Sequence, residues 1–330
     1  MATIHEVAAR AGVSTATVSR ALNGKSTVDP ELATRVAAAA RELDYRPNAV
    51  ARNLRRQATT VWALIISDIE NPFFTAVARG VEDVAQAAGH SVVLCNSDED
   101  LDKEARYLQV AVAERVAGVV LSPTTVDTDI GPLVEHGIPV VAIDRPLRGI
   151  STVLVGSRTG ARDATTHLIA AGYRRIGCIT GPQRVSTAEQ RVDGYAEALR
   201  ASGRRLNHRL VRHADFKVSG GRRAAERLLD ASRPPDALFV ANSLMAIGAL
   251  QALAARGLRA GRDVGMVAFD DAPWTQLVDP PITVVAQPAY AIGEAAGRLL
   301  ADGGAPRTVT LDAELIIRAS SRGASGHQQS

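Results

Sequence analysis

Hydrophobic residues follow two patterns along the chain, and each pattern predicts a different kind of element. Near the amino terminus, Ile4, Val7, Ala8 and Ala11 recur at the spacing of one face of a short helix. From Val61 onward, short continuous apolar runs alternate with longer stretches of helical period, which predicts parallel strands buried between helices. We expect strands at Val61–Ile66, Ser91–Cys95, Gly118–Leu121, Val140–Ile143, Ile176–Ile179, Ala237–Val240 and Gly265–Phe269, and helices at Phe73–Ala88, Gly160–Ala171, Thr187–Ala201 and Leu244–Ala255.

Residues 1–47 have the signals of a three-helix helix-turn-helix head. Gly12 can adopt the positive φ that a sharp turn needs, and Ser14 is a good N-cap for a second helix. Asp29 and Pro30 are typical of the start of a third helix, which we expect to end near Leu43. In the second helix Val18 and Leu22 face inward, so the outer side carries small side chains that permit close approach to DNA bases and an arginine that can pair with guanine. These outer residues are Thr15, Ala16, Thr17, Ser19 and Arg20.

Residues 48–59 predict a hinge helix and linker. Val50, Ala51 and Leu54 form one apolar face, and arginines surround it. A helix of this length is marginal alone in water, so we expect it to need a partner. The partner could be a second copy of the same helix or a DNA groove, into which Leu54 could wedge.

Charge and composition support a DNA-binding end. Residues 1–60 hold nine Lys/Arg against five Asp/Glu, whereas the other 270 residues hold 29 against 30, so the basic excess is confined to one end. No apolar run is long enough for a membrane span, and the amino terminus does not read as a secretory signal. We therefore expect a cytoplasmic protein without membrane contact, whose two cysteines, Cys95 and Cys178, are buried free thiols.

Polar residues cluster where the predicted strands end. Ligands of doubly wound sheets bind outside the carboxyl ends of strands, so the set predicts a cleft there. Its members are Asp68, Asn96, Ser122, Asp144, Asn242 and Asp270.

The head and hinge motifs resemble the lactose/galactose repressor family. They read Ala8-x3-Gly12-Val-Ser-x2-Thr17-Val-Ser-Arg20-x2-Asn23, followed by Leu43-x-Tyr45-x-Pro-Asn48-x2-Ala51-x2-Leu54. The resemblance implies that a homodimer binds double-stranded, palindromic operator DNA, with the second helix in the major groove and paired hinge helices in the minor groove. By position, Thr15, Ala16 and Arg20 would read bases and Leu54 would be the wedge. Further DNA contacts would come from Ser14, Thr17, Ser19, Asn23, Tyr45, Asn48, Ala51 and Arg55.

The same resemblance implies an α/β core like a periplasmic binding protein, with two doubly wound subdomains. We expect the N-terminal subdomain at residues 60–157 plus 288–318, the C-terminal subdomain at 158–287, a polar tail at 319–330, and crossovers near Ser157, Gln287 and Glu314. Val185 occupies a position that is Arg in the purine-binding member, which favours a sugar or polyol effector over a purine. By position, the effector residues would be Phe73, Arg145, Thr187, Arg191, Phe216, Asn242 and Asp270.

Two other classes of protein have α/β modules of this kind, solute-binding proteins for transport and metabolic α/β enzymes. The first predicts a signal peptide and no basic head. The second predicts an acid/base or nucleophile constellation in the cleft, and the sequence has none beyond isolated carboxylates. The seven histidines show no metal-binding spacing, so we expect no metal site, no cofactor and no enzymatic activity.

Overall fold

The structure is a computed structural model that describes residues 2–22, 28–45 and 59–323. The chain divides into two compact units, Met1–Thr59 and Thr60–Ser330, which are described separately below. The expected hinge helix lies outside the described residues. None of the helices described is long and apolar enough to cross a membrane.

The first unit is a three-helix head, with α1 at Ile4–Ala11, α2 at Thr15–Leu22 and α3 at Pro30–Glu42. Thr3 and Glu6 form a reciprocal capping box at the start of α1, and Gly12 ends the helix with φ 65°. The Ser14 hydroxyl accepts from the Thr17 backbone N–H at 3.1 Å, and Asp29 caps α3. The turn and cap residues predicted from the sequence therefore act as expected.

A small apolar core holds the three helices together. Val7 of α1, Val18 of α2 and Val36 of α3 are fully buried and belong to one cluster. The Arg35 guanidinium donates to the Ala11 carbonyl at the end of α1, which ties α3 to the turn between α1 and α2.

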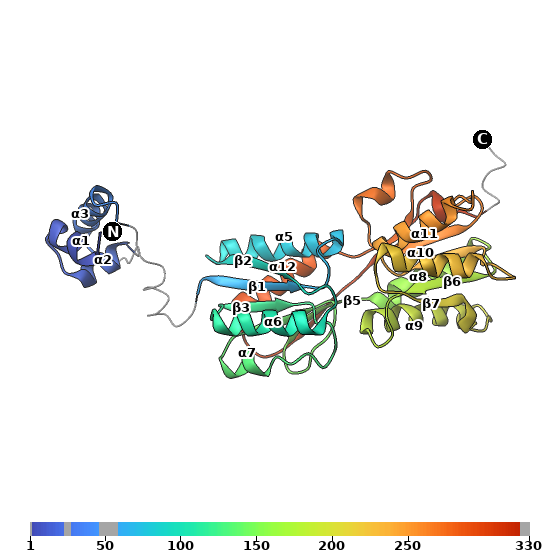
Figure 1. Ribbon diagram of the computed structural model, residues 1–330, viewed down its shortest axis with the longest axis horizontal. Helices are drawn as coiled ribbons and strands as arrows, with labels where there is room; N and C mark the ends of the chain where they lie inside the picture. Colours follow the sequence, from blue (N-terminus) through green and yellow to red (C-terminus); the bar gives the residue numbers. More distant parts are fainter. Residues whose placement is uncertain (1, 23–27, 46–58, 324–330) are drawn as a thin grey trace. The chain divides into compact units, whose positions relative to one another are not determined.

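The second unit contains two lobes built on the same plan (Figure 1). The N-lobe consists of residues 60–156 and 288–312, and the C-lobe of residues 157–287 and 313–323. Each lobe has a six-stranded sheet, ordered β11-β5-β4-β3-β1-β2 in the N-lobe and β12-β10-β9-β8-β6-β7 in the C-lobe. All pairings are parallel except that of β12 with β10. The strands are β1 Val61–Ile66, β2 Ser91–Asn96, β3 Gly118–Leu121, β4 Val140–Ile143, β5 Ser151–Val155, β6 Ile176–Thr180, β7 Val211–His213, β8 Ala237–Val240, β9 Gly265–Phe269, β10 Thr283–Ala286, β11 Thr308–Leu311 and β12 Glu314–Ile316.

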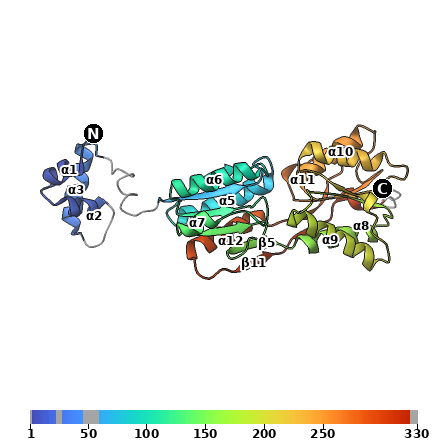
Figure 2. The ribbon, with the colours of Figure 1, turned by 60° about the horizontal axis from the view of Figure 1, so that its bottom comes forward.

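Helices cover both faces of each sheet, as Figures 1 and 2 show. Successive side chains of a strand point to opposite faces. Accordingly Leu64 of β1 packs in the cluster under α5 and α12, whereas Ile65 packs in the cluster under α6 and α7. In the C-lobe, α10 and α11 cover one face and α8 and α9 the other. These helices are α5 Pro72–Ala87, α6 Leu101–Ala113, α7 Gly131–Glu135, α8 Ser157–Ala170, α9 Ser186–Ala201, α10 Val218–Leu229, α11 Ser243–Ala254 and α12 Ala289–Asp302, with short 3-10 turns at His208–Leu210, Pro273–Gln276 and Ala319–Ser321.

The chain crosses between lobes three times. It passes from β5 to α8 at Gly156, from β10 to α12 at residues 287–288, and from β11 to β12 at residues 312–313. Helix α12 returns to the N-lobe and packs closely on α5, where a Cβ on Gly80 would stand 2.2 Å from the Tyr290 carbonyl oxygen. The N-lobe is thus completed by a segment that follows the C-lobe in sequence.

Two expected boundaries near the carboxyl end are wrong. Residues 314–318 were assigned to the N-terminal subdomain, but β12 pairs with β10 and belongs to the C-lobe. The tail expected from residue 319 begins later, because Ser320 and Ser321 are fully buried. The Ser320 hydroxyl donates to the Met266 carbonyl and accepts from the Thr283 backbone N–H.

Candidate functional site

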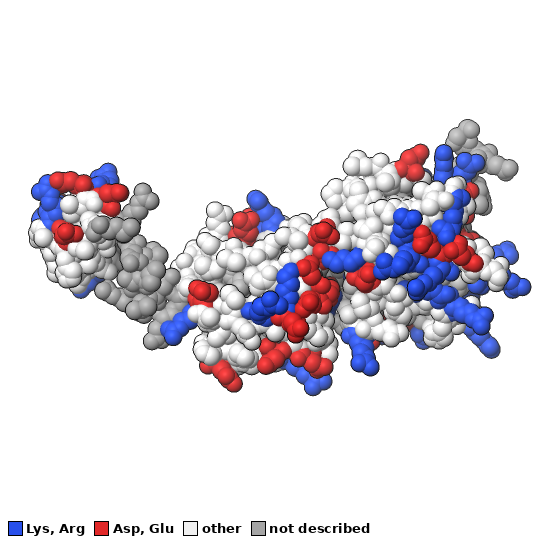
Figure 3. All heavy atoms as spheres, viewed as in Figure 1, with Lys and Arg blue, Asp and Glu red and all other residues white. Residues whose placement is uncertain are grey.

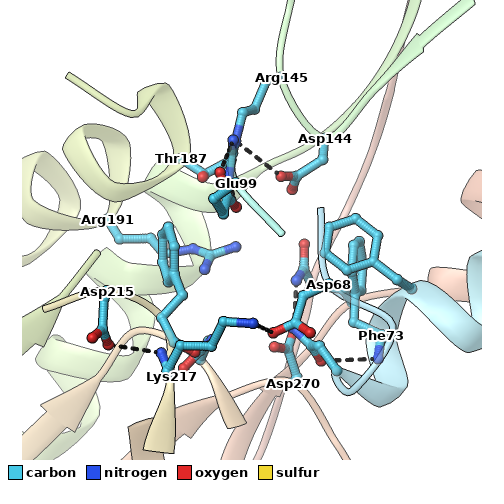
Figure 4. Close-up of a pocket in the computed structure, with 15 residues that line it drawn as sticks. Asp68, Phe73, Glu99, Asp144, Arg145, Thr187, Arg191, Asp215, Lys217 and Asp270 are labelled. Carbon is cyan, nitrogen blue, oxygen red and sulfur yellow. Dashed lines mark hydrogen bonds and ion pairs between the residues drawn. The ribbon is translucent and has the colours of Figure 1, made fainter. Parts of the chain in front are cut away.

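A polar cavity lies between the lobes, where the carboxyl ends of their strands meet (Figure 4). The atom-free space among its lining residues measures about 460 Å³, a figure that includes open solvent. All seven residues expected to contact an effector line the cavity. The complete lining is Asp68, Asn71, Phe73, Phe74, Glu99, Asp144, Arg145, Thr187, Arg191, Asp215, Phe216, Lys217, Asn242, Asp270 and Gln287.

Arg191 is the central cation of this cavity. It projects from α9, is 4% exposed, and its guanidinium carbon lies 4.0 Å from the centre of the Phe269 ring. One terminal nitrogen donates to the Ala241 carbonyl, and the other lies 3.5 Å from the Ser157 hydroxyl. Burial lowers the pKa of Arg191, whereas the carboxylates of Asp270 and Asp144 act to raise it.

Asp144 and Asp270 occupy corresponding places in the two lobes. Asp144 directly follows β4 and Asp270 directly follows β9, which are each the fourth strand of their lobe in chain order. Both residues have a positive φ, 65° and 72° respectively. Burial raises the pKa of both carboxyls; the charge of Arg145, followed by that of Arg191, opposes the rise for Asp144, and Arg191 opposes it for Asp270. The side chain of Gln287, at the second crossover, donates to Asp270. A guanidinium is therefore placed in the field of two buried carboxyls, one from each lobe.

Arg145 is engaged within the N-lobe. Its two terminal nitrogens donate to the two carboxylate oxygens of Glu99 at 2.7 and 2.6 Å. One of them also donates to the Pro123 and Thr124 carbonyls. Hydrogen bonding to Glu99 raises the pKa of Arg145 against the opposing effect of its burial. Arg145 thus has little donor capacity left for a ligand.

Asn242 also has structural partners. Its side-chain oxygen accepts from the Met245 backbone N–H at 2.8 Å and caps α11, and its amide nitrogen donates to the Phe216 carbonyl at 2.9 Å. Thr187 lies in the first turn of α9 and is buried. Phe73, in the first turn of α5, and Phe216 bring aromatic rings to the cavity from opposite lobes.

Two buried polar atoms that line the cavity have no partner within the part of the protein described. They are Nε of Arg191 and the side-chain oxygen of Gln287, whereas Nε of Arg145 lies 3.5 Å from the Asp144 carboxylate. Buried polar groups are normally hydrogen-bonded, so each such atom calls for a partner from outside the chain. A donor and an acceptor of this kind suit a ligand that carries hydroxyl groups.

Two of the six polar strand-end residues do not line the cavity. Asn96 accepts from the Ile69 backbone N–H, and Ser122 bonds the Ser67 hydroxyl at 3.0 Å. Conversely, the resemblance did not include Glu99, Asp215, Lys217 or Gln287, which line the cavity from loops and from the crossover. Loop residues carry no periodic signal, and only the fold brings them to the site.

The head presents the expected outer face. Ala16 and Arg20, four residues apart on α2, are exposed, and Thr15, Thr17 and Ser19 are half-exposed. The Ser14 and Thr17 hydroxyls lie 2.9 Å apart at the start of this helix. Tyr45 is half-buried and packs against the core of the head. The other predicted DNA contacts, Asn23, Asn48, Ala51, Leu54 and Arg55, lie outside the described residues.

A helix-turn-helix head and a two-lobed module with a buried polar cleft define a ligand-responsive, DNA-binding transcription regulator. Comparisons with known proteins agree with this class. Residues 3–48 match the model of the bacterial regulatory proteins of the lacI family, and residues 165–321 match a periplasmic binding protein-like domain.

The relatives are similar over nearly the whole chain. The HTH-type transcriptional repressor CytR of Escherichia coli K12 is 34% identical over 331 residues, which covers 97% of this chain and 96% of that protein. The chain belongs to the lacI family of bacterial regulatory proteins.

Two solved structures extend the comparison. The transcriptional regulator CelR in complex with cellobiose is 34% identical, with a TM-score of 0.74, and the match covers 97% of this chain and 100% of that one. The lac repressor dimer bound to operator and the anti-inducer ONPF is 26% identical, with a TM-score of 0.86, covering 97% of this chain and 99% of that one. The expected fold is confirmed.

Proposed function

We propose that this protein is a homodimeric repressor that binds a palindromic operator and responds to an uncharged sugar or polyol in the interlobe cavity. The observation that carries the effector assignment is the pair of unpartnered polar atoms on Arg191 and Gln287, which line one cavity with two aromatic rings. Hydroxyl groups can pair with the polar atoms, while Phe73 and Phe216 can cover the apolar face of a sugar ring.

The charges of the cavity favour an uncharged effector. Glu99 pairs with Arg145, and Asp68 accepts from the Lys217 ammonium at 2.8 Å. Arg191 lies in the field of two carboxyls. No cation that lines the cavity is therefore left without a carboxylate, and a phosphate or sugar acid would find no free partner. Cellobiose, present in the CelR complex, is a neutral sugar.

The operator-binding face that we propose is the exposed side of α2. Thr15, Ala16 and Arg20 would contact base edges, and Ser14, Thr17 and Ser19 would hold phosphates, because short side chains allow the helix to lie close to DNA. Two heads of a dimer would read half-sites about 34–36 Å apart, one helical turn. The solved complex of the lac repressor dimer with operator supports this arrangement.

The effector assignment can be tested by a thermal-shift screen of neutral mono- and disaccharides, polyols and nucleosides, each paired with its phosphorylated or oxidised counterpart. We expect a stabilising hit among the neutral compounds and none among their anionic counterparts, because a ligand that binds only the folded state stabilises it by RT ln(1 + L/Kd), where L is the free ligand concentration. A hit confined to the anionic compounds would contradict the assignment.

The operator assignment needs a separate measurement. Fragments selected from genomic DNA by the full-length protein should share a palindrome, and fluorescence anisotropy should give the affinity for it with and without the hit. Ligand and operator affinities must change each other by the same factor, since binding free energies are linked. Equal operator affinity at zero and saturating ligand would refute the coupling.

A further inference from the structure

The two lobes carry opposite charges, although the second unit as a whole is nearly neutral. The N-lobe holds eight Lys/Arg against 17 Asp/Glu, and the C-lobe, with the carboxyl-terminal residues to 330, holds 21 against 13. Figure 3 shows acidic side chains gathered on the N-lobe at its border with the C-lobe, and basic side chains gathered over the C-lobe. Opposite charges thus face each other where the lobes meet.

One ion pair joins the lobes directly. Lys217, the residue before α10 of the C-lobe, donates its ammonium to the Asp68 carboxylate, which follows β1 of the N-lobe, at 2.8 Å (Figure 4). The Asp68 side chain is 8% exposed and the Lys217 side chain 32%. The pair is therefore partly shielded from solvent, which strengthens it relative to a surface pair.

Lys217 faces further carboxylates of the N-lobe. Burial acts to lower the pKa of Lys217, and Asp68 acts against it, followed by the charges of Asp98 and Glu70, so that the pKa is raised. Asp98 itself pairs with Lys103 within the N-lobe, at 2.5 Å. We name Asp68, Glu70 and Asp98 the acidic rim. Among the ion pairs of the described residues, Lys217–Asp68 is the one that links this rim to the C-lobe.

We propose that Lys217 and the acidic rim form an electrostatic clasp that sets the balance between open and closed lobes. Both partners line the cavity, so opening the clasp would widen the way into it. The clasp deepens the proposed function, because a site that must be open to admit an effector and closed to hold it binds with an affinity that depends on this balance. It also makes the balance sensitive to ionic strength, since salt screens the rim charges that lie beyond direct contact.

The test measures lobe opening itself and needs neither effector nor operator, so its failure would leave the proposed function standing. Nitroxide labels are placed on cysteines at two exposed positions, Gln86 of α5 and Gln251 of α11, after Cys95→Ser and Cys178→Ala have removed the native thiols. The full chain is mixed with excess unlabelled protein, and label distances are measured by double electron–electron resonance at 50 and 500 mM NaCl.

We expect a predominantly short distance at 50 mM NaCl and a growing long-distance population at 500 mM. Lys217→Met should raise the ratio of open to closed molecules about three- to thirtyfold at low salt, the range between an exposed ion pair and a charged hydrogen bond. It should also abolish most of the salt dependence. Lys217→Arg should retain the closed population.

Lys103→Met is the matched control. It removes a lysine that pairs with Asp98 of the acidic rim, but Lys103 and Asp98 both belong to the N-lobe. We expect no increase in the open population for this variant. Distance distributions that are the same in the parent protein and in Lys217→Met at both salt concentrations would overturn the clasp. So would a Lys103→Met variant that opens as far as Lys217→Met.

Discussion

Replacing Arg191 by Met tests whether the buried guanidinium is what permits two carboxyls to share the cavity. The change removes the charge that faces Asp144 and Asp270, the hydrogen bond to Ala241 and the contact with the Phe269 ring. Removing one member of a buried charge cluster costs about 3–5 kcal/mol when a remaining charge is left desolvated and without its counter-charge. Here that charge is Asp270, whereas Asp144 keeps its contact with Arg145 at 3.5 Å. We expect a loss of this size at pH 7.5.

Urea unfolding followed by tryptophan fluorescence measures the loss of stability in the second unit, Thr60–Ser330, which contains Arg191. The two tryptophans, Trp62 and Trp274, both belong to the second unit, so unfolding of the head does not contribute. Adding Asp270→Asn to Arg191→Met should recover roughly 1–3 kcal/mol, since the amide needs no counter-charge. Arg158→Met, which breaks an exposed pair with Glu197, is the control and should leave the unfolding free energy nearly unchanged.

The loss should also depend on pH in a defined direction. Burial raises the pKa of both carboxyls, and removing Arg191 removes a charge that opposes this rise. At pH 5 the folded variant can take up protons that neutralise the carboxyls, so the loss from Arg191→Met should be smaller than at pH 7.5. A loss below about 1 kcal/mol, or a double variant no more stable than the single one, would refute the reasoning.

Three further predictions concern single side chains. Arg20→Ala should weaken operator binding by about 1–3 kcal/mol and relax preference at one base pair per half-site, measured by anisotropy on operator variants; unchanged preference would exclude Arg20 as a reader. Gly181→Ala would put a Cβ 1.9 Å from the Phe216 ring, so calorimetry should show at least about tenfold weaker effector binding, and intact affinity would show that the ring is not part of the site. Asp144→Asn removes a carboxyl whose pKa is raised in the folded state, and such a carboxyl makes stability fall as pH rises above its unfolded pKa. The unfolding free energy of this variant relative to the parent protein should therefore increase from pH 5 to pH 8, and a constant or decreasing difference would contradict the burial of this charge.

The sequence predicted the parts of the fold that depend on local pattern. Gly12, Ser14 and Asp29 have the turn and cap roles expected of them, because those roles depend on the residue itself and its nearest neighbours. The apolar runs also predicted seven of the strands, β1, β2, β3, β4, β6, β8 and β9, since buried parallel strands are continuously apolar. The apolar runs did not predict β5 and β10, which lie inside their sheets, or the edge strands β7, β11 and β12. Strand β7 has three residues, and β12 belongs to a sheet whose other strands lie far back in the chain.

The residues of the cavity also divide into those that the sequence predicted and those that it did not. Arg191 and Asp270 follow from position in the family pattern, and both line the site. Glu99 and Lys217 do not follow from any local pattern, because each acts through a partner, Arg145 or Asp68, that only the folded chain brings near. Glu99 and Arg145 are 46 residues apart in the sequence, and Asp68 and Lys217 are 149 apart. The topology of the fold brings each pair together, so a local sequence pattern cannot predict it.

The return of the chain to the N-lobe affects the order in which the two lobes can fold during synthesis on the ribosome. Helix α12 and strand β11, which complete the N-lobe core and its sheet, are made after five of the six C-lobe strands. The first lobe to emerge therefore waits, with the apolar face under α5 and α12 unfinished, until the second lobe has largely been synthesised. We expect the C-lobe to acquire its core first, so that the order of folding reverses the order of the lobes in the sequence.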